Sequence, residues 1–260
     1  MGNFSGPTAS YYAKYRRGYP GQIVDAIVER LQLDRRDAVI DLGCGTGLLT
    51  VAVASRVGLV VGVDPEVDML AEARTSIDRA LRTHVVWVLG SDADVPSLAA
   101  MRENGGWGAI TVGQALHFMD HVQLFARARE MVRPGGGLAI VSNGTPLWQQ
   151  ASDWSRALRT ALEGWFQTSI AATCGTADAD RARYRADLEQ AGFAVDEVAY
   201  DYEAELTIHD IVGGVLSAVS PTDVPTDARA DFAERITQAL PQRASFVESV
   251  PVVALLGVRP

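Results

Sequence analysis

The sequence predicts an α/β fold built on a parallel β-sheet, and the pattern of its first half supports this prediction. Between about residues 20 and 145, short apolar runs bounded by turn residues alternate with segments whose apolar residues recur every three or four positions. Strands that alternate with helices at this spacing form parallel sheets with right-handed crossovers. Such sheets bind ligands beyond the carboxyl ends of their strands, and we expect the functional residues there.

The elements of the first half follow from this periodicity and from the turn residues between them. The predicted strands cover residues 38–41, 59–63, 84–89, 109–112 and 138–141. The predicted helices cover residues 22–33, 48–57, 66–81 and 122–132. Pro65 suits the start of the third helix, and Pro134 with the three glycines after it predicts a turn before the fifth strand.

The second half is predicted to be mainly helical. Along residues 147–166, Trp148, Trp154 and Trp165 fall on one face of an amphipathic helix. This stripe is either the buried face of the helix or the lining of an aromatic acceptor pocket. Further helices are predicted at 208–219 and 228–240, with strands at 193–202 and 246–258, the last interrupted by Pro251.

We interpret residues 1–260 as a single domain in which the extra helices form a lid over the end of the sheet. The parts are an N-terminal flap and helix (1–35), a ligand-binding core (36–145), helical lid segments (146–190 and 205–245) and a final strand (246–260). The hydrophobic share of 48% and charged share of 21% are typical of a packed globular protein.

Charge and cysteine content narrow the class of protein. The formal net charge of −9 would repel a nucleic-acid backbone, so no nucleic-acid partner is expected. The two cysteines, Cys44 and Cys174, do not make a disulfide framework, which indicates reduced thiols and a cytoplasmic protein. The first ten residues lack an apolar signal core and no segment has 18 consecutive apolar residues, so no membrane association is expected.

A glycine-rich loop follows the first predicted strand, where residues 39–47 read VIDLGCGTG. Glycines let a backbone turn sharply and approach a ligand closely. A dinucleotide-binding loop would have a small residue five positions after Gly43, where this chain has Leu48. Asp41 would repel a pyrophosphate but would suit the ammonium of an amino-acid ligand, directly or through water. The loop therefore favours a ligand with an amino-acid group over a dinucleotide.

Residues 39–47 resemble the first motif of the class I S-adenosylmethionine-dependent methyltransferases, and the resemblance runs from about Tyr11 to Val141. The chain looks most like the type 11 methyltransferases of small molecules. The resemblance implies a Rossmann-like, doubly wound, mostly parallel sheet of seven strands with a helical lid. It also implies S-adenosylmethionine as the cofactor, held at this loop by Asp41, Gly43, Cys44 and Gly45.

Other motifs match the family's contacts to the nucleoside. Asp64, at the end of the second strand, lies where the family places an acid on the two ribose hydroxyls, whose protons a carboxylate can accept together. Asp64 could instead, or in addition, cap the helix that begins beside Pro65. The resemblance also implies cofactor contacts for Pro65 and for Met69, which would pack on the adenine; Met69 alone would more often be a core residue.

Residues 90–96, which read GSDADVP, resemble the family's adenine-binding segment. Asp92 is expected to accept a hydrogen bond from the adenine amino group, and the backbone amide of Ala93 to reach a ring nitrogen. Asp94 is an alternative to Asp92, because the spacing fits both.

The fourth predicted strand leads into TVGQALHFMD at residues 111–120, which by the resemblance passes the methionyl part of the cofactor. Gly113 and Gln114 are its expected contacts. His117 is the candidate catalytic base: methyl transfer from a sulfonium needs no acid, but an OH or NH acceptor must lose a proton. An imidazole, with an ordinary pKa near 6.5, suits that task at neutral pH. Alternatively, His117 hydrogen-bonds to backbone and only shapes the loop.

The N-terminal residues 10–20, SYYAKYRRGYP, are aromatic and basic. Such a segment can bind nucleic acid, but the overall acidity of the chain argues against this. Similar methyltransferases carry it as a flap over the bound cofactor, which implies that Tyr15 and Arg16 touch the cofactor's carboxylate.

The leading hypothesis is a methyltransferase acting on an oxygen or nitrogen atom of a small molecule, with natural-product biosynthesis as its setting. The alternatives are a non-methylating protein of the same fold, such as a cyclase or a binding protein, and an NAD-dependent oxidoreductase. No metal site is expected. The sequence predicts neither the identity of the acceptor nor the oligomeric state.

Overall fold

The computed structural model describes residues 4–100, 106–171 and 174–260. The chain forms two compact units. The sheet unit comprises Arg17–Asn143, Gly175–Tyr200 and Val252–Pro260, and the helical unit comprises Met1–Arg16, Gly144–Cys174 and Asp201–Pro251. The segment 146–190, which we assigned to a lid, is therefore divided between the units, and its part from Gly175 onward belongs to the sheet unit.

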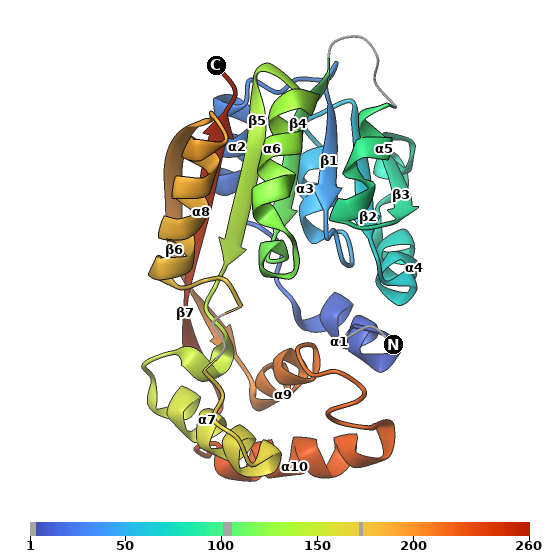
Figure 1. Ribbon diagram of the computed structural model, residues 1–260. Helices are drawn as coiled ribbons and strands as arrows, with labels where there is room; N and C mark the ends of the chain where they lie inside the picture. Colours follow the sequence, from blue (N-terminus) through green and yellow to red (C-terminus); the bar gives the residue numbers. More distant parts are fainter. Residues whose placement is uncertain (1–3, 101–105, 172–173) are drawn as a thin grey trace. The chain divides into compact units, whose positions relative to one another are not determined.

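A seven-stranded sheet runs through the described residues in the order β3-β2-β1-β4-β5-β7-β6 (Figure 1). Its strands are β1 (Ala38–Leu42), β2 (Leu59–Asp64), β3 (Val85–Leu89), β4 (Trp107–Gly113), β5 (Val132–Asn143), β6 (Ala194–Leu206) and β7 (Phe246–Val258). Strands β1 to β5 pair in parallel, and β7 pairs antiparallel with β5. The predicted α/β fold with a mostly parallel, doubly wound sheet is confirmed.

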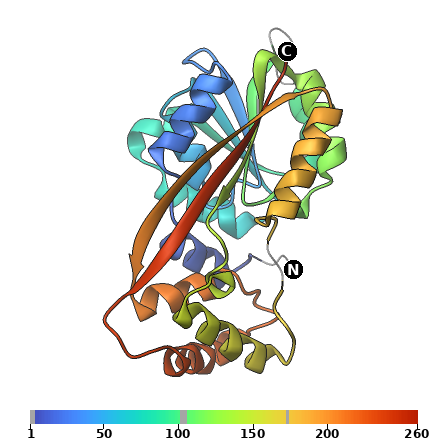
Figure 2. The ribbon, with the colours of Figure 1, turned by 90° about the vertical axis from the view of Figure 1, so that its left-hand side faces the viewer.

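Helices cover both faces of this sheet. The helices of the sheet unit are α2 (Gly21–Arg30), α3 (Leu48–Ala54), α4 (Val67–Ser76), α5 (Val95–Ala99), α6 (His121–Met131) and α8 (Asp178–Gln190). Helices α2 and α3 pack together on one face, and α6 packs against α5 and α8 on the other (Figure 2). All five residues of β1 are buried, as expected for a parallel strand with both faces covered.

Several predicted elements differ in extent, two of them in the first half by five residues or more at one end. The helix predicted over 66–81 ends at Ser76, and a 3₁₀ helix (Arg79–His84) follows, capped by the Asp78 carboxylate, which accepts a hydrogen bond from the amide of Ala80. The turn predicted at Pro134 was wrong, because these residues lie inside β5. There the register against β4 shifts between Trp107 and Ala109, and Gly135 takes a positive φ of 75°.

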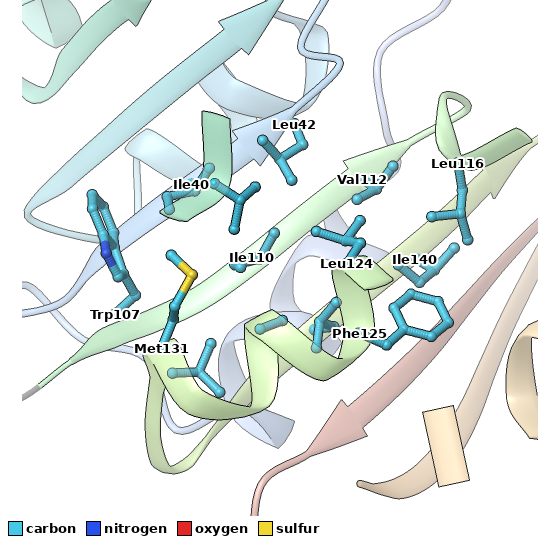
Figure 3. Packing of buried hydrophobic residues seen from close by; sticks show 14 of the residues in the cluster. Ile40, Leu42, Trp107, Ile110, Val112, Leu116, Leu124, Phe125, Met131 and Ile140 are labelled. Atoms are coloured by element: carbon cyan, nitrogen blue, oxygen red, sulfur yellow. The ribbon is translucent and has the colours of Figure 1, made fainter. Parts of the chain in front are cut away.

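A large apolar cluster of the sheet unit lies between the sheet and helices α5, α6 and α8. Side chains of β1, β4 and β5 interlock there with Leu124 and Phe125 of α6 (Figure 3). Tyr184 and Leu188 of α8 belong to the same cluster. This packing fixes the carboxyl ends of the central strands, from which the glycine loop and the loop carrying His117 leave.

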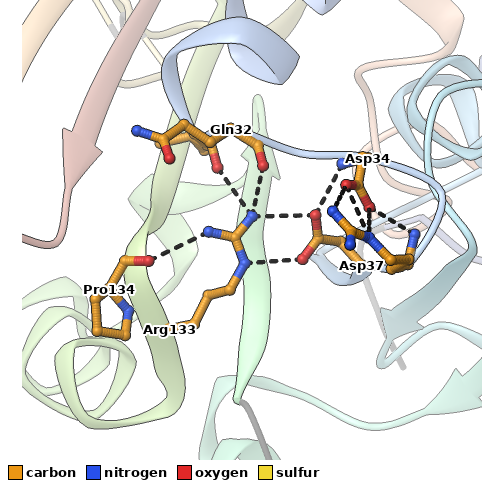
Figure 4. Close-up of polar contacts among 7 residues, drawn as sticks. Gln32, Asp34, Asp37, Arg133 and Pro134 are labelled. Atoms are coloured by element: carbon orange, nitrogen blue, oxygen red, sulfur yellow. Dashed lines mark hydrogen bonds and ion pairs between the residues drawn. The ribbon is translucent and has the colours of Figure 1, made fainter.

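At the amino ends of the central strands, Arg133 links the start of β5 to the segment before β1 (Figure 4). Its Nε donates to Oδ1 of Asp37 at 2.8 Å and its Nη2 to Oδ2 at 3.0 Å, and Nη2 also donates to the carbonyl oxygen of Gln32 at 2.6 Å. A two-pronged guanidinium–carboxylate pair is geometrically specific, so this contact orients β1 relative to β5.

The helical unit is built from α1 (Pro7–Tyr15), α7 (Asp153–Phe166), α9 (Ile208–Leu216) and α10 (Arg229–Ala239). The helix predicted over 147–166 divides into a 3₁₀ turn (Leu147–Gln149) and α7. Trp154 is 2% exposed in an apolar cluster shared by α7, α9 and α10, so the core interpretation holds for this tryptophan. No helix within the described ranges is both long enough and apolar enough to cross a lipid bilayer.

Candidate active site

The glycine loop turns directly off the end of β1 and is tied to the end of β2. The amide of Cys44 donates to the carbonyl oxygen of Val63 at 3.1 Å, and the amide of Gly45 donates to Oδ2 of Asp64 at 2.8 Å. All three of its glycines have left-handed backbone conformations, and two of them have no room for a side chain. A Cβ on Gly43 (φ 65°) would lie 2.5 Å from Cβ of Ala115, and one on Gly47 (φ 86°) 2.6 Å from the indole of Trp87.

Asp41 lies beneath this loop and is 1% exposed. Its Oδ2 accepts from the Thr50 hydroxyl at 2.5 Å, and its Oδ1 accepts from the Thr111 hydroxyl at 2.7 Å. Burial raises the pKa of Asp41 from 3.8 to about 6, although the two hydroxyls oppose the rise. The carboxylate is thus held by neutral donors from α3 and β4.

Asp64, at the end of β2, is the second buried carboxylate of the loop and is 6% exposed. Besides the bond from Gly45, its Oδ1 accepts from the amide of Glu66 at 2.9 Å. Burial raises the pKa of Asp64, and these two backbone donors oppose the rise. Our alternative, that Asp64 caps the next helix, was wrong: α4 begins at Val67 and its N-cap position is Glu66.

The residues predicted at the nucleoside end fall on or beside the ends of β2 and β3. Met69 is 3% exposed on α4, whereas Pro65 is exposed. Asp92 is half-buried, and its Oδ2 accepts from the amide of Asp120 at 3.2 Å. The two other candidates for adenine binding, Ala93 and Asp94, both form hydrogen bonds with Ser91. Oδ2 of Asp94 accepts from the Ser91 amide at 2.8 Å, and the amide of Ala93 donates to the Ser91 hydroxyl at 3.3 Å.

At the end of β4, Gly113 and Gln114 are braced by neighbouring segments of the sheet unit. A Cβ on Gly113 would lie 2.3 Å from the hydroxyl oxygen of Tyr19. Gln114 adopts a positive φ of 57°, its amide donates to the carbonyl oxygen of Val141, and its Nε2 donates to that of Asn143 at 2.8 Å. A non-glycine residue held in this conformation indicates a constrained loop, as is common near functional sites.

His117 lies in the 3₁₀ turn that follows (Leu116–Phe118) and is half-buried. Its ring is 3.9 Å from that of Phe118, and its Nδ1 would lie 3.6 Å from a Cβ built on Gly175. Burial lowers the pKa of His117 below 6.5, and Asp180 opposes the fall. Among the described residues, no hydrogen bond joins the imidazole to the backbone, so that alternative role is not observed there.

Comparison with known proteins places this arrangement in a family. The family model of the methyltransferase domain matches residues 39–136. A methyltransferase of Mycobacterium tuberculosis with no characterized activity is 26% identical over 244 residues, which cover 94% of this chain and 88% of that protein. A second one from that organism is 30% identical over 161 residues, covering 62% of this chain and 71% of that protein.

The chain belongs to the class I S-adenosylmethionine-dependent methyltransferases.

Two further kinds of similarity accompany this result. The trans-aconitate 2-methyltransferase of Pseudomonas aeruginosa is 32% identical over 162 residues, covering 59% of this chain and 51% of that enzyme. Among solved structures, a candidate type II methyltransferase from Anaeromyxobacter dehalogenans aligns with a TM-score of 0.60 at 19% identity, over 94% of this chain and 98% of that one. Precorrin 8w decarboxylase from Methanobacterium thermoautotrophicum aligns with a TM-score of 0.53 at 14% identity, over 94% of both chains. Both solved structures share the fold of this chain.

S-adenosylmethionine is therefore the cofactor of this methyltransferase, and the loop has the chemistry to hold it. Asp41 and Asp64 are buried carboxylates without an ion-pair partner among the described residues. The Thr46 hydroxyl, in the middle of the loop, is buried and finds no hydrogen-bond partner in the described ranges. A ligand with an ammonium and a diol complements such groups, whereas the described residues contain no cluster of three acidic, histidine or cysteine side chains that could hold a metal.

The predicted flap residues Tyr15 and Arg16 belong to the helical unit of this methyltransferase, where their polar side-chain atoms contact other side chains. The hydroxyl of Tyr15 lies 2.5 Å from Nε2 of His209, and Nε of Arg16 donates to the Ser217 hydroxyl at 2.8 Å. The ring of Tyr15 also occupies the space over Gly213, where a Cβ would lie within 2.5 Å of it. Their contact with the cofactor stays a prediction.

Sequence reasoning missed several residues that shape the site. Trp87 on β3 lies against both Gly47 and Gly62, since a Cβ on Gly62 would be 2.7 Å from its indole. The sequence does contain a signal for this contact: Gly62 lies within an otherwise apolar strand, and such a glycine often marks a close approach by another group. Tyr19 covers Gly113 and His209 pairs with Tyr15, but nothing in their local sequence indicates these long-range contacts.

Proposed function

We propose that this methyltransferase transfers the methyl group to an oxygen or nitrogen atom of a small molecule, and that His117 accepts the proton of the acceptor. The supporting observation is the half-buried imidazole after the end of β4, whose pKa is lowered by burial so that it is neutral at pH 7. A neutral imidazole at that place can act as a general base, which a surface histidine with a raised pKa would do less well.

The chemistry divides between cofactor and protein. S-adenosylmethionine supplies an electrophilic methyl group on a sulfonium whose sulfur departs as a neutral thioether. The acceptor's lone pair forms the new bond to carbon, and its proton passes to His117. The other residues would orient and shield the cofactor: Asp64 would hold the ribose, Asp41 would attract the ammonium of the amino-acid end, and the braced Gly113–Gln114 turn would limit how the acceptor approaches. Alignment of this kind accounts for much of the acceleration of a displacement reaction.

A carboxylate oxygen is the second candidate acceptor, because a relative is named as a trans-aconitate 2-methyltransferase. A carboxylate is already deprotonated at neutral pH, so this reaction would not need a base. The proposal also includes a secondary metabolite as the acceptor and the cytoplasm as the compartment. The compartment is supported by the free thiols of Cys44 and Cys174.

The test begins with a screen of alcohol, amine and carboxylic-acid acceptors using methyl-labelled cofactor. His117→Ala should lower turnover of the best alcohol or amine by about 10²–10⁴-fold. Binding of S-adenosylhomocysteine, measured by calorimetry, should change little. His84→Ala is the matched control, because His84 is also half-buried but hydrogen-bonds to the carbonyl of Gly58. Near-normal turnover of His117→Ala at pH 7 would exclude the base role, and labelling of carboxylic acids alone would favour the second candidate.

A further inference from the structure

Arg229, the first residue of α10 in the helical unit, carries a buried positive charge with few partners. The residue is 6% exposed. Its Nε and Nη1 atoms are buried and have no hydrogen-bond partner within the described part of the chain. Arginine stays protonated in proteins and has N–H groups on all three nitrogens, so most of its donors here are unused.

The hydrogen-bond and ring partners that Arg229 has among the described residues are neutral. Its Nη2 donates to the Thr8 hydroxyl at 2.9 Å, and that hydroxyl in turn donates to the carbonyl oxygen of Val219 at 3.0 Å. The guanidinium carbon lies 5.7 Å from the centre of the Tyr11 ring, within the range of a cation–π contact. Among the described residues, no carboxylate forms an ion pair with Arg229.

An isolated buried charge is energetically costly, and burial lowers the pKa of Arg229 accordingly. Structural arginines avoid this cost by pairing with a carboxylate, as Arg133 does with Asp37 in the sheet unit. A buried polar group that lacks its partners calls for an explanation, and an anionic ligand supplies one.

We propose that Arg229 is the centre of an anion-binding site in the helical unit, and that its ligand is the carboxylate of a small organic acid with an apolar body. One guanidinium matches the single charge of a carboxylate and its planar geometry better than the higher charge of a phosphate. The apolar body is indicated by the surroundings. Tyr11 packs against the apolar cluster of this unit, and Phe232, one turn along α10, is a buried member of it.

This inference does not depend on His117 or on the nature of the methyl acceptor. It is tested by ligand-dependent thermal unfolding of the full chain, with benzoate as the probe. Acetate and inorganic phosphate are compared at equal ionic strength set with chloride. Any ligand that binds only the folded state raises the melting temperature in a saturable manner.

The variants are Arg229→Met, which removes the charge and the donors but keeps an unbranched chain, and Arg229→Lys, which keeps the charge. Arg235→Met, an exposed position on the same helix, is the matched control. We expect benzoate to raise the melting temperature of the wild type and of Arg235→Met, to raise that of Arg229→Lys less, and not to change that of Arg229→Met. Without ligand, Arg229→Met should melt no lower than the wild type, because it removes an uncompensated charge.

Four results would overturn the proposal. Equal benzoate stabilisation of Arg229→Met and wild type would place the site elsewhere. Absence of any anion-dependent stabilisation of the wild type, or a ligand-free Arg229→Met that melts far below the wild type, would assign Arg229 a structural role. Stronger stabilisation by phosphate than by benzoate would refute the carboxylate assignment.

Discussion

Replacement of Asp41 by asparagine tests the electrostatics of the cofactor loop most directly. The carboxylate is fully buried, its pKa is raised by burial from 3.8 to about 6, and its two hydrogen bonds come from the Thr50 and Thr111 hydroxyls. Asparagine has nearly the same shape and can bond to both hydroxyls, one as acceptor and one as donor. The substitution therefore removes the ionisation and little else.

The sign and size of the effect follow from proton linkage. Between pH 3.8 and about 6 the folded protein holds a proton on Asp41 that the unfolded chain has lost, so the stability of the wild type falls as pH rises. Each unit of pKa corresponds to about 1.36 kcal/mol, which gives a total loss of about 3 kcal/mol above pH 6. Roughly half of this loss occurs by pH 5 and the other half between pH 5 and pH 8.

The assay is urea unfolding followed by circular dichroism at pH 5 and pH 8, for the wild type and Asp41→Asn. The stability advantage of the variant should grow by roughly 1 kcal/mol between the two pH values. Other titrating groups cancel in this difference, and Asp25→Asn, an exposed member of an ion pair with Arg56, should show no such growth. A pH-independent difference between Asp41→Asn and wild type would refute the reasoning, since it would mean that Asp41 has an ordinary pKa in the folded protein.

Further expected outcomes concern the same loop. Asp64→Ala should weaken binding of S-adenosylhomocysteine at least about tenfold by calorimetry, because a charged hydrogen-bond partner of the ribose is worth about 1.5–3 kcal/mol. Asp68→Ala, exposed on α4, is its control, and normal affinity of Asp64→Ala would exclude the ribose role. Gly47→Ala should lower the free energy of unfolding by about 1–3 kcal/mol, since its φ is 86° and the new Cβ would meet Trp87 at 2.6 Å. Unchanged stability of Gly47→Ala in urea would show that the loop can relax.

The sequence predicted the sheet unit well wherever one local signal sufficed. The apolar runs located β1, β2 and β4 to within two residues at each end, because strands buried on both faces are apolar over most of their length. The loop after β1 was predictable for a similar reason, since its glycines and Asp41 lie within a few residues of one another.

Helix α8 shows where this reasoning failed. Its sequence, DADRARYRADLEQ, has only Tyr184 and Leu188 as buried residues, so it has almost no apolar stripe to detect. Both residues nevertheless enter the core of the sheet unit beside α6, and His121 of α6 reaches Asp187 at 2.9 Å. The sequence therefore predicted residues 146–190 as lid, because the contacts that assign α8 to the sheet unit are made with residues far away in the chain.

Contacts between residues far apart in the chain also determine how much of the cofactor site could be predicted. Asp41 and Asp64 each lie within the last two residues of an apolar strand, but their shared property is visible only in the fold. Both are buried, and both are held by hydroxyl or backbone donors instead of cations. Two such carboxylates near one loop create a negative potential that a pyrophosphate would have to oppose. A ligand that is cationic at its sulfonium and ammonium lowers the energy of the same arrangement. The electrostatics of the loop, more than the spacing of its glycines, thus favour S-adenosylmethionine over a dinucleotide.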